Sequence, residues 1–147
     1  MSDVITKEIQ ELEDRGEEIA EELDLFPDHQ ELFHHIINIG RKYPALPDEY
    51  RTEDRLLPGC ISQLWIQGDI QDGKVHFYMD ADAMISKGLA ALLLNFYNGK
   101  HPEAVIRAEP AFLNKSGLLK MVSGNRSNSL VYLRDYTKNF AAQALSV

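Results

Sequence analysis

The segment from Met84 to Tyr97 constrains the fold more than any other part of this sequence, because its apolar residues fall on most sides of a helix. Asp80 and Asp82 precede it as candidate N-caps, and Asn98-Gly99 follows as a C-terminal stop. A helix that is apolar on most faces must be buried, so other elements must cover it on several sides. The side chains that predict this core helix are Met84, Ile85, Leu89, Ala90, Leu92, Leu93, Leu94, Phe96 and Tyr97.

Two strand-like stretches come before the core helix. Ile61–Gln67 ends at Gly68-Asp69, and Lys74–Met79 follows Asp72-Gly73; both are rich in β-branched and aromatic residues. Their spacing predicts an antiparallel hairpin with a short turn. A third short strand is expected over Arg55–Leu57.

Helices are expected before and after this hairpin along the chain. An amphipathic helix is predicted from Ile5 to Leu23, and a second begins near Pro27-Asp28 and ends between Gly40 and Tyr43. After the core helix, Pro102 starts a short helix through Arg107, residues 112–121 form another, and Asn125 or Ser127 caps the last. This order predicts an α+β fold in which helices pack on one face of a small antiparallel sheet.

We expect one domain over residues 1–147, with a core at 28–142 and an acidic N-terminal helix at 5–24. The net charge is −8, and residues 1–31 carry −10 of it, leaving +2 for the remainder. The acidic run is interpreted as a solvated helix face. Because the basic residues are scattered, nucleic acid is not an expected partner.

The sequence also predicts where the protein resides. No apolar run approaches the roughly 18 residues of a membrane-spanning helix, and the N-terminus lacks the apolar region of a signal peptide. With one cysteine the chain cannot form an internal disulfide or a four-thiolate metal site. A cytoplasmic location and no membrane partner are therefore expected.

That single cysteine, Cys60, follows the turn residues Pro58-Gly59 and precedes an apolar run. A free cysteine is often a small buried hydrophobe, but a thiol on a loop beside a rigid scaffold can also be a reactive group. A reactive Cys60 needs a cation or a donor nearby to lower a thiol pKa of about 8.5. A cysteine-dependent hydrolase and a redox-sensing thiol module both stay open on this reasoning.

Other candidate sites are weaker. The five histidines show no metal-ligand spacing, and no glycine-rich phosphate loop is present. Asp80 and Asp82 are interpreted as helix caps in preference to a paired-carboxylate site. Arg126 stands at a predicted junction between a loop and a helix, where an ordinary exposed charge is the simplest interpretation.

Four segments in order along the chain together resemble the SufE family of sulfur-acceptor proteins. They are residues 39–47 (IGRKYPALP), 58–66 (PGCISQLWI), 81–89 (ADAMISKGL) and 125–130 (NRSNSL). The combination of G-C-x-S-Q-x-W-I with D-A-x-x-x-K-G-L some twenty residues later is specific. The resemblance implies a three-stranded antiparallel sheet packed with helices, as in SufE and NifU-like proteins.

The resemblance also implies a function. Cys60 would accept sulfur as a persulfide from a pyridoxal-phosphate-dependent, SufS-like cysteine desulfurase, activate that enzyme, and pass the sulfur to an iron-sulfur scaffold complex. The chain itself would bind no cofactor or metal and would act with its partner instead of as a stand-alone enzyme. We expect a monomer or a weak homodimer.

Site residues follow from the same resemblance. Arg126 matches the family arginine expected to stabilise the thiolate or persulfide of Cys60. Gly59, Ser62, Gln63, Asp82 and Lys87 are the expected partner-binding residues, and the role of Lys87 is either docking or structural.

Overall fold

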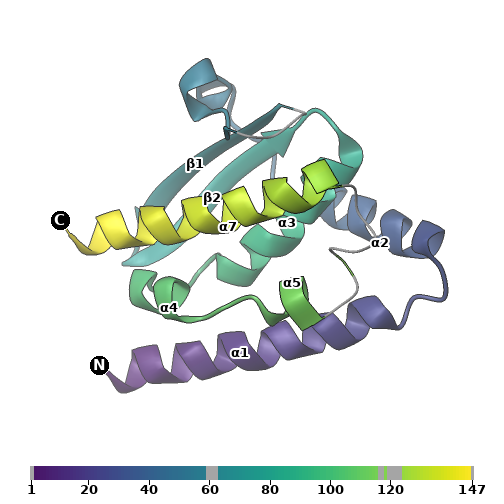
Figure 1. Ribbon diagram of the computed structural model, residues 1–147. Helices are drawn as coiled ribbons and strands as arrows, with labels where there is room; N and C mark the ends of the chain where they lie inside the picture. The colour runs from purple at the N-terminus through teal and green to yellow at the C-terminus, as the bar shows by residue number, and fades with distance from the viewer. Residues whose placement is uncertain (1, 59–62, 116–117, 119–123, 147) are drawn as a thin grey trace.

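A computed structural model describes residues 2–58, 63–115, 118 and 124–146, and at residues 115 and 125–127 it describes the backbone alone. Figure 1 shows a small antiparallel sheet with helices on one side of it. The elements in chain order are α1 (Asp3–Asp24), α2 (His29–Lys42), the 3₁₀ turns η1 (Asp48–Tyr50) and η2 (Glu53–Arg55), β1 (Leu64–Gln71), β2 (Lys74–Ala81), α3 (Met84–Tyr97), α4 (Pro102–Arg107), α5 (Ala111–Lys115) and α7 (Gly124–Leu145).

The sheet is a hairpin whose register runs from Leu64 opposite Ala81 to Gln71 opposite Lys74. Its turn is Asp72-Gly73, with φ of 53° and 77°, and such consecutive positive φ values suit the right-handed twist of the flanking strands. The strand boundary predicted at Gly68-Asp69 is wrong, because β1 continues through Gly68 to Gln71.

The predicted third strand over Arg55–Leu57 is also wrong, and the described residues form a sheet of two strands. Arg55 ends the 3₁₀ turn η2, and only Leu56 makes an isolated bridge to Trp65. Within the described residues the pairing along this edge of β1 is confined to that bridge and the adjacent hydrogen bond from the Leu57 N–H to the Leu64 carbonyl.

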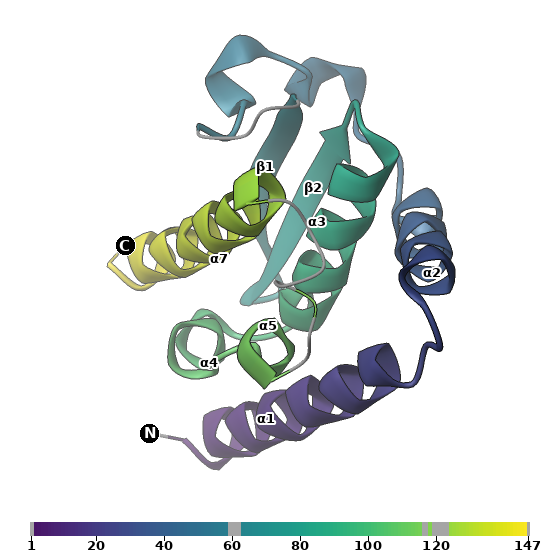
Figure 2. The same cartoon turned by 45° about the vertical axis from the view of Figure 1, so that its right-hand side comes forward.

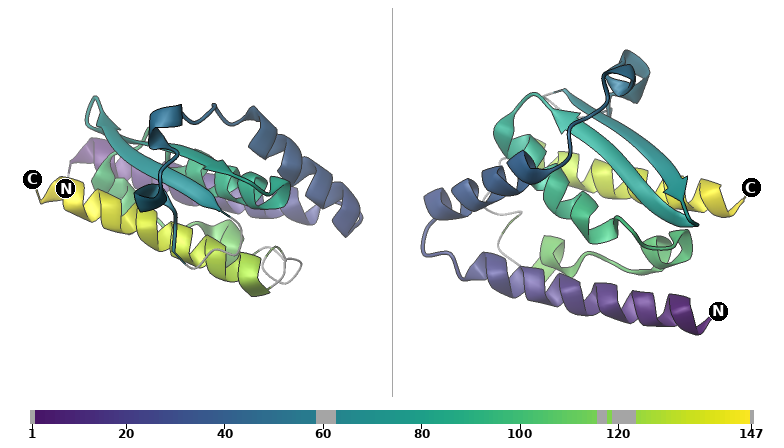
Figure 3. Two further views of the ribbon diagram at one scale, coloured as in Figure 1. Left: turned by 90° about the horizontal axis from the view of Figure 1, so that it is seen from above. Right: turned by 180° about the vertical axis from the view of Figure 1, so that it is seen from behind.

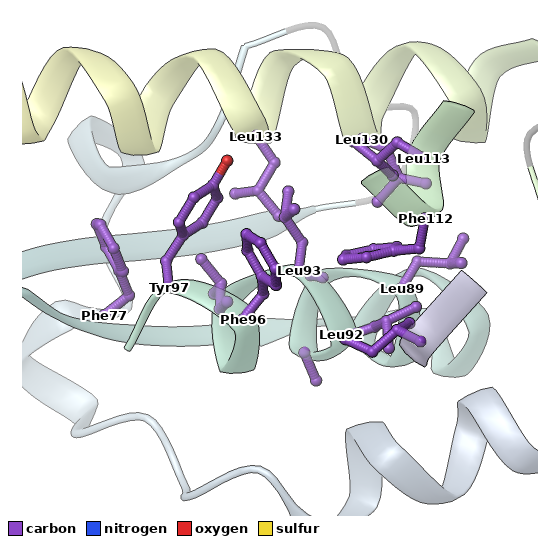
Figure 4. Close-up of a cluster of buried hydrophobic side chains, with 14 of the residues drawn as sticks. Phe77, Leu89, Leu92, Leu93, Phe96, Tyr97, Phe112, Leu113, Leu130 and Leu133 are labelled. Atoms are coloured by element: carbon purple, nitrogen blue, oxygen red, sulfur yellow. The ribbon is translucent and has the colours of Figure 1, made fainter. Parts of the chain in front are cut away.

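The core lies between the sheet and the helices. Alternate strand residues, among them Ile66, Phe77 and Met79, point inward and are almost fully buried. Figure 2 shows α3 and α7 together in front of the hairpin, with the connector that bears η1 and η2 at its upper end. Figure 4 shows side chains of α3 reaching toward α5 and α7 in one apolar cluster. The core helix predicted from its all-round apolar pattern is therefore α3.

Helices α2 and α3 pack closely because glycines meet where they cross. A methyl group on Gly40 would lie 2.8 Å from the backbone nitrogen of Gly88, and one on Gly88 would overlap the carbonyl group of Ile36. Side chains at either position would force the helices apart. The glycine of the K-G-L motif therefore has a packing role in this fold.

Helix α1 covers the far side of α3 together with α4 and α5, and it runs antiparallel to α7 (Figure 3). Its buried residues include Leu12, Ile19 and Leu23, while its carboxylates other than that of Glu8 face outward. Glu8 fixes its start by accepting a hydrogen bond from the backbone N–H of His101 at 2.9 Å and pairing with the His101 ring nitrogen at 2.7 Å. Both ends of the chain lie on the same side of the molecule.

A partly buried hydrogen-bond network protects the outer edge of β2. The Tyr43 hydroxyl donates to the carbonyl of Phe77 at 2.6 Å and accepts from the Asn98 amide at 2.8 Å, while Asn98 accepts from the Phe77 N–H at 2.9 Å. Burial raises the pKa of Tyr43 to about 12, although the hydrogen bond with Asn98 opposes this shift. These side chains take the place of another strand along this edge.

The last two helices differ from expectation at their starts. The N-cap predicted at Asn125 or Ser127 is wrong, because both lie within α7, which already includes Gly124. Of the helix predicted over residues 112–121, Ala111–Lys115 is α5 and Leu118 is also helical; the rest lies outside the described residues.

Candidate functional site

The chain leaves and rejoins the sheet at the open end of the hairpin, on either side of Cys60. Cys60, Gly59 and Ser62 lie outside the described residues, but both flanks of this segment are described. The Leu57 N–H donates to the Leu64 carbonyl at 2.8 Å, next to the bridge between Leu56 and Trp65. The cysteine therefore belongs to a connection whose two ends are fixed to each other and to β1.

Asp82 holds the downstream flank. Its carboxylate accepts a hydrogen bond from the Gln63 N–H at 3.0 Å, and its own N–H donates to the Gln63 carbonyl at 3.1 Å. The predicted capping role of Asp82 is wrong, because the N-cap of α3 is Ala83 and no side chain caps it. Two hydrogen bonds to one backbone unit fix the position of Gln63 instead. Partner binding by Gln63 and Asp82 stays a prediction.

Asp80, the other predicted cap, lies in β2 and joins two cations. Its carboxylate contacts the Arg51 guanidinium at 2.6 Å and the Lys87 ammonium at 3.2 Å, and it accepts from the Ala81 N–H at 2.8 Å. Partial burial alone would raise the pKa of Asp80, but these hydrogen bonds and the charge of Lys87 outweigh it and hold the pKa below its usual value. The carboxylate is therefore ionised, and Lys87 is held in place by it.

Arg51 links this carboxylate to the sheet surface. Its guanidinium carbon lies 4.7 Å from the ring centre of Trp65, which pairs with Asp80 across the hairpin. No local pattern in the sequence indicates Arg51, because it lies in an irregular connector and meets partners far along the chain. The sequence does show Asp80 and Asp82 two residues apart at the end of a predicted strand, but the same spacing also fits a helix cap.

The remaining predicted residues are only partly placed. Arg126 lies in the first turns of α7, and its side chain is outside the described part of the structure. Its predicted role beside Cys60 therefore stays a prediction. Within the described ranges, no three His, Cys, Asp or Glu side chains gather as ligands for a metal ion. Over the same ranges no helix combines the length and apolarity needed to cross a bilayer.

The comparison with protein families shows to which family this chain belongs. Residues 17–141 match the SufE family, described as an Fe-S metabolism associated domain. The chain belongs to the SufE family. The match begins inside α1 and so includes the last turns of the acidic helix, where Ile19, Ala20 and Leu23 are buried.

Relatives of the SufE family extend over most of the chain. A SufE-like protein of Rhizobium etli is 34% identical over 120 residues, covering 78% of this chain and 80% of the relative. The sulfur acceptor protein CsdE of Escherichia coli is 31% identical over 103 residues, covering 69% and 70%.

A solved structure supports the fold. The solution structure of a hypothetical protein from Thermus thermophilus superposes with a TM-score of 0.73 at 22% identity, covering 90% of this chain and 96% of that one. This likeness concerns the arrangement of helices and strands alone.

Proposed function

We propose that this protein accepts sulfur from a cysteine desulfurase as a persulfide on Cys60 and delivers it to iron-sulfur cluster assembly. Membership of the SufE family carries the proposal, together with the similarity to a protein named as a sulfur acceptor. Cys60 is the one thiol in the sequence, so any sulfur carried as a persulfide on this chain must be there.

The proposed step is an exchange between a thiolate and a persulfide. The Cys60 thiolate attacks the outer sulfur of the desulfurase persulfide, an S–S bond forms to Cys60, and the original S–S bond breaks. The desulfurase cysteine leaves as a thiolate, so no external oxidant or reductant is consumed. A second attack by a thiolate of the scaffold would pass the same sulfur onward.

Two features of the chain support this chemistry. With no second cysteine, no internal thiol can attack a Cys60 persulfide and discharge it as a disulfide. The two described flanks, at Leu57 and Gln63, are both fixed at the open end of the hairpin, and a thiol carried between them would be presented beside a rigid scaffold. Cations at this end, Arg51 and Lys87, would favour the anionic sulfur, although Asp80 shares both.

The experiment measures alanine release by the cysteine desulfurase of the source organism, with L-cysteine as substrate and a mild reductant as final sulfur acceptor. We expect the wild-type protein to raise the turnover rate and Cys60→Ser to leave it at the level of the desulfurase alone. Equal stimulation by both proteins would contradict the proposal. A melting curve for Cys60→Ser that matches wild type excludes loss of fold as the cause.

A further inference from the structure

A groove of about 240 Å³ lies beside the open end of the hairpin, between the end of α2 and the start of α3. These two ends lie next to each other when the molecule is seen from behind (Figure 3, right). Its lining includes Ile37, Arg41, Asp80, Asp82, Met84 and Lys87. A groove of this size accommodates one or two side chains.

Arg41 supplies an unmatched positive charge. Its guanidinium makes two long contacts with neutral acceptors, the side-chain amide oxygen of Asn38 at 3.5 Å and the Met84 sulfur at 3.9 Å. No carboxylate within the described ranges pairs with it, although a guanidinium carries five donors suited to a carboxylate. Arg41 therefore offers most of its hydrogen-bonding capacity to an incoming group.

The two carboxylates of the groove do not fill this role. Asp80 is engaged by Arg51 and Lys87, and Asp82 accepts from the Gln63 N–H. Both negative charges are thus directed toward the hairpin and its flanking segment. Arg41 therefore lacks an anionic partner within the groove.

Met84 supplies an apolar contact next to this charge. It is 60% exposed, which is unusual for a large apolar side chain in this protein, and Ile37 is half-buried beside it. A single exposed apolar residue needs no explanation, but one that borders an unmatched arginine in a groove defines a mixed recognition surface. A thioether also adapts its shape to different partners.

We propose that this groove binds an acidic segment of the cysteine desulfurase, with a carboxylate on Arg41 and a neighbouring apolar side chain against Met84 and Ile37. The inference rests on the proposed function, since that function supplies the partner. Gln63, which Asp82 holds beside the groove, follows Cys60 by three residues, so their Cα atoms are at most about 11 Å apart. A partner bound in the groove would thus be aligned with the sulfur-carrying segment.

The test compares two charge reversals in the same helical turn. Arg41 lines the groove, whereas its exposed neighbour Lys42 does not, and both stand in the last turn of α2. Long-range electrostatics and the helix dipole affect Arg41→Glu and Lys42→Glu to similar extents. We expect Arg41→Glu to raise the Kd for the desulfurase about tenfold at low salt, and Lys42→Glu to change it less than about twofold. Equal effects of the two variants on the Kd would overturn the proposal that the groove binds the desulfurase.

A crosslinking measurement identifies the chemistry of the partner. With p-benzoylphenylalanine at Met84, irradiation should link the desulfurase through a peptide that contains Asp or Glu, whereas the same probe at Ile70, near the hairpin turn, should not. A linked peptide without a carboxylate, or equal linking from both positions, would overturn the inference.

The two proposals fail in different ways. If wild-type protein and Lys42→Glu gain sulfur from the desulfurase while Arg41→Glu binds as tightly as wild type, the proposal of groove binding is wrong and the proposed sulfur-acceptor function stands. If wild-type protein neither binds the desulfurase nor gains sulfur, both are overturned.

Discussion

Replacing Asp82 by alanine should loosen the downstream flank of the Cys60 segment without unfolding the protein. The substitution removes the acceptor of the Gln63 N–H but keeps the reverse hydrogen bond from the backbone of residue 82. Both residues are exposed, so the lost bond is worth about 1 kcal/mol, less than a buried bond to a charged group. That energy corresponds to an increase of about fivefold in the local opening equilibrium.

Amide hydrogen exchange measured by NMR at Gln63 tests this value. We expect exchange about five times faster in Asp82→Ala than in wild type, with Asp82→Asn between them because its amide oxygen is a neutral acceptor. Asp135→Ala is the matched control, since Asp135 is an exposed carboxylate of α7 paired with the adjacent Arg134. Unchanged exchange at Gln63 in Asp82→Ala would refute the conclusion that this carboxylate holds the segment.

Three further substitutions and one pH titration test the contacts around the site. Gly88→Ala should lower the free energy of unfolding by about 3 kcal/mol, because the added methyl group overlaps a backbone carbonyl of α2; an unchanged thermal melt would contradict the close helix crossing. Tyr43→Phe should cost about 1–3 kcal/mol near neutral pH. Burial raises the pKa of Tyr43 to about 12 from an unfolded value of about 10, so the stabilisation by this phenol should decline as the pH rises through that interval. The free energies of unfolding of wild type and Tyr43→Phe, measured by urea titration, should therefore converge over the same interval. Arg51→Ala should change the emission of Trp65, the only tryptophan, whereas the same spectrum from both proteins would exclude the stacking contact. The pKa of Asp80 lies below its usual value of about 4, so the ionised carboxylate should stabilise the folded state above pH 4, and this stabilisation should be lost as the pH falls through the lower folded pKa. In an acid titration of the wild-type protein followed by Trp65 emission, a midpoint above pH 4 would contradict this.

The elements that the sequence predicted well are those whose cause is local. The core helix α3 follows from an apolar pattern on most of its faces, and the start of α2 follows from Asp28, which caps it through a bond to the Glu31 N–H. The hairpin itself was also expected, and Asp72-Gly73 supplies a turn that needs two positive φ values.

The predictions that failed depend on contacts between distant parts of the chain. Asp82 could cap α3, but the backbone of Gln63, brought near by strand pairing, takes its carboxylate instead. The stretch at Arg55 looked like a strand, yet the Arg55 side chain bonds Gln67 at 2.6 Å while its backbone closes a 3₁₀ turn. No local pattern shows which of two competing partners a polar side chain will meet.

The most direct test of the central claim is the intact mass of the protein after incubation with the cysteine desulfurase and L-cysteine, without reductant. We expect one added sulfur atom per chain, located at Cys60 by peptide mapping and removed by a thiol reductant. Wild-type protein that gains no sulfur, or Cys60→Ser that gains as much as wild type, would contradict this claim.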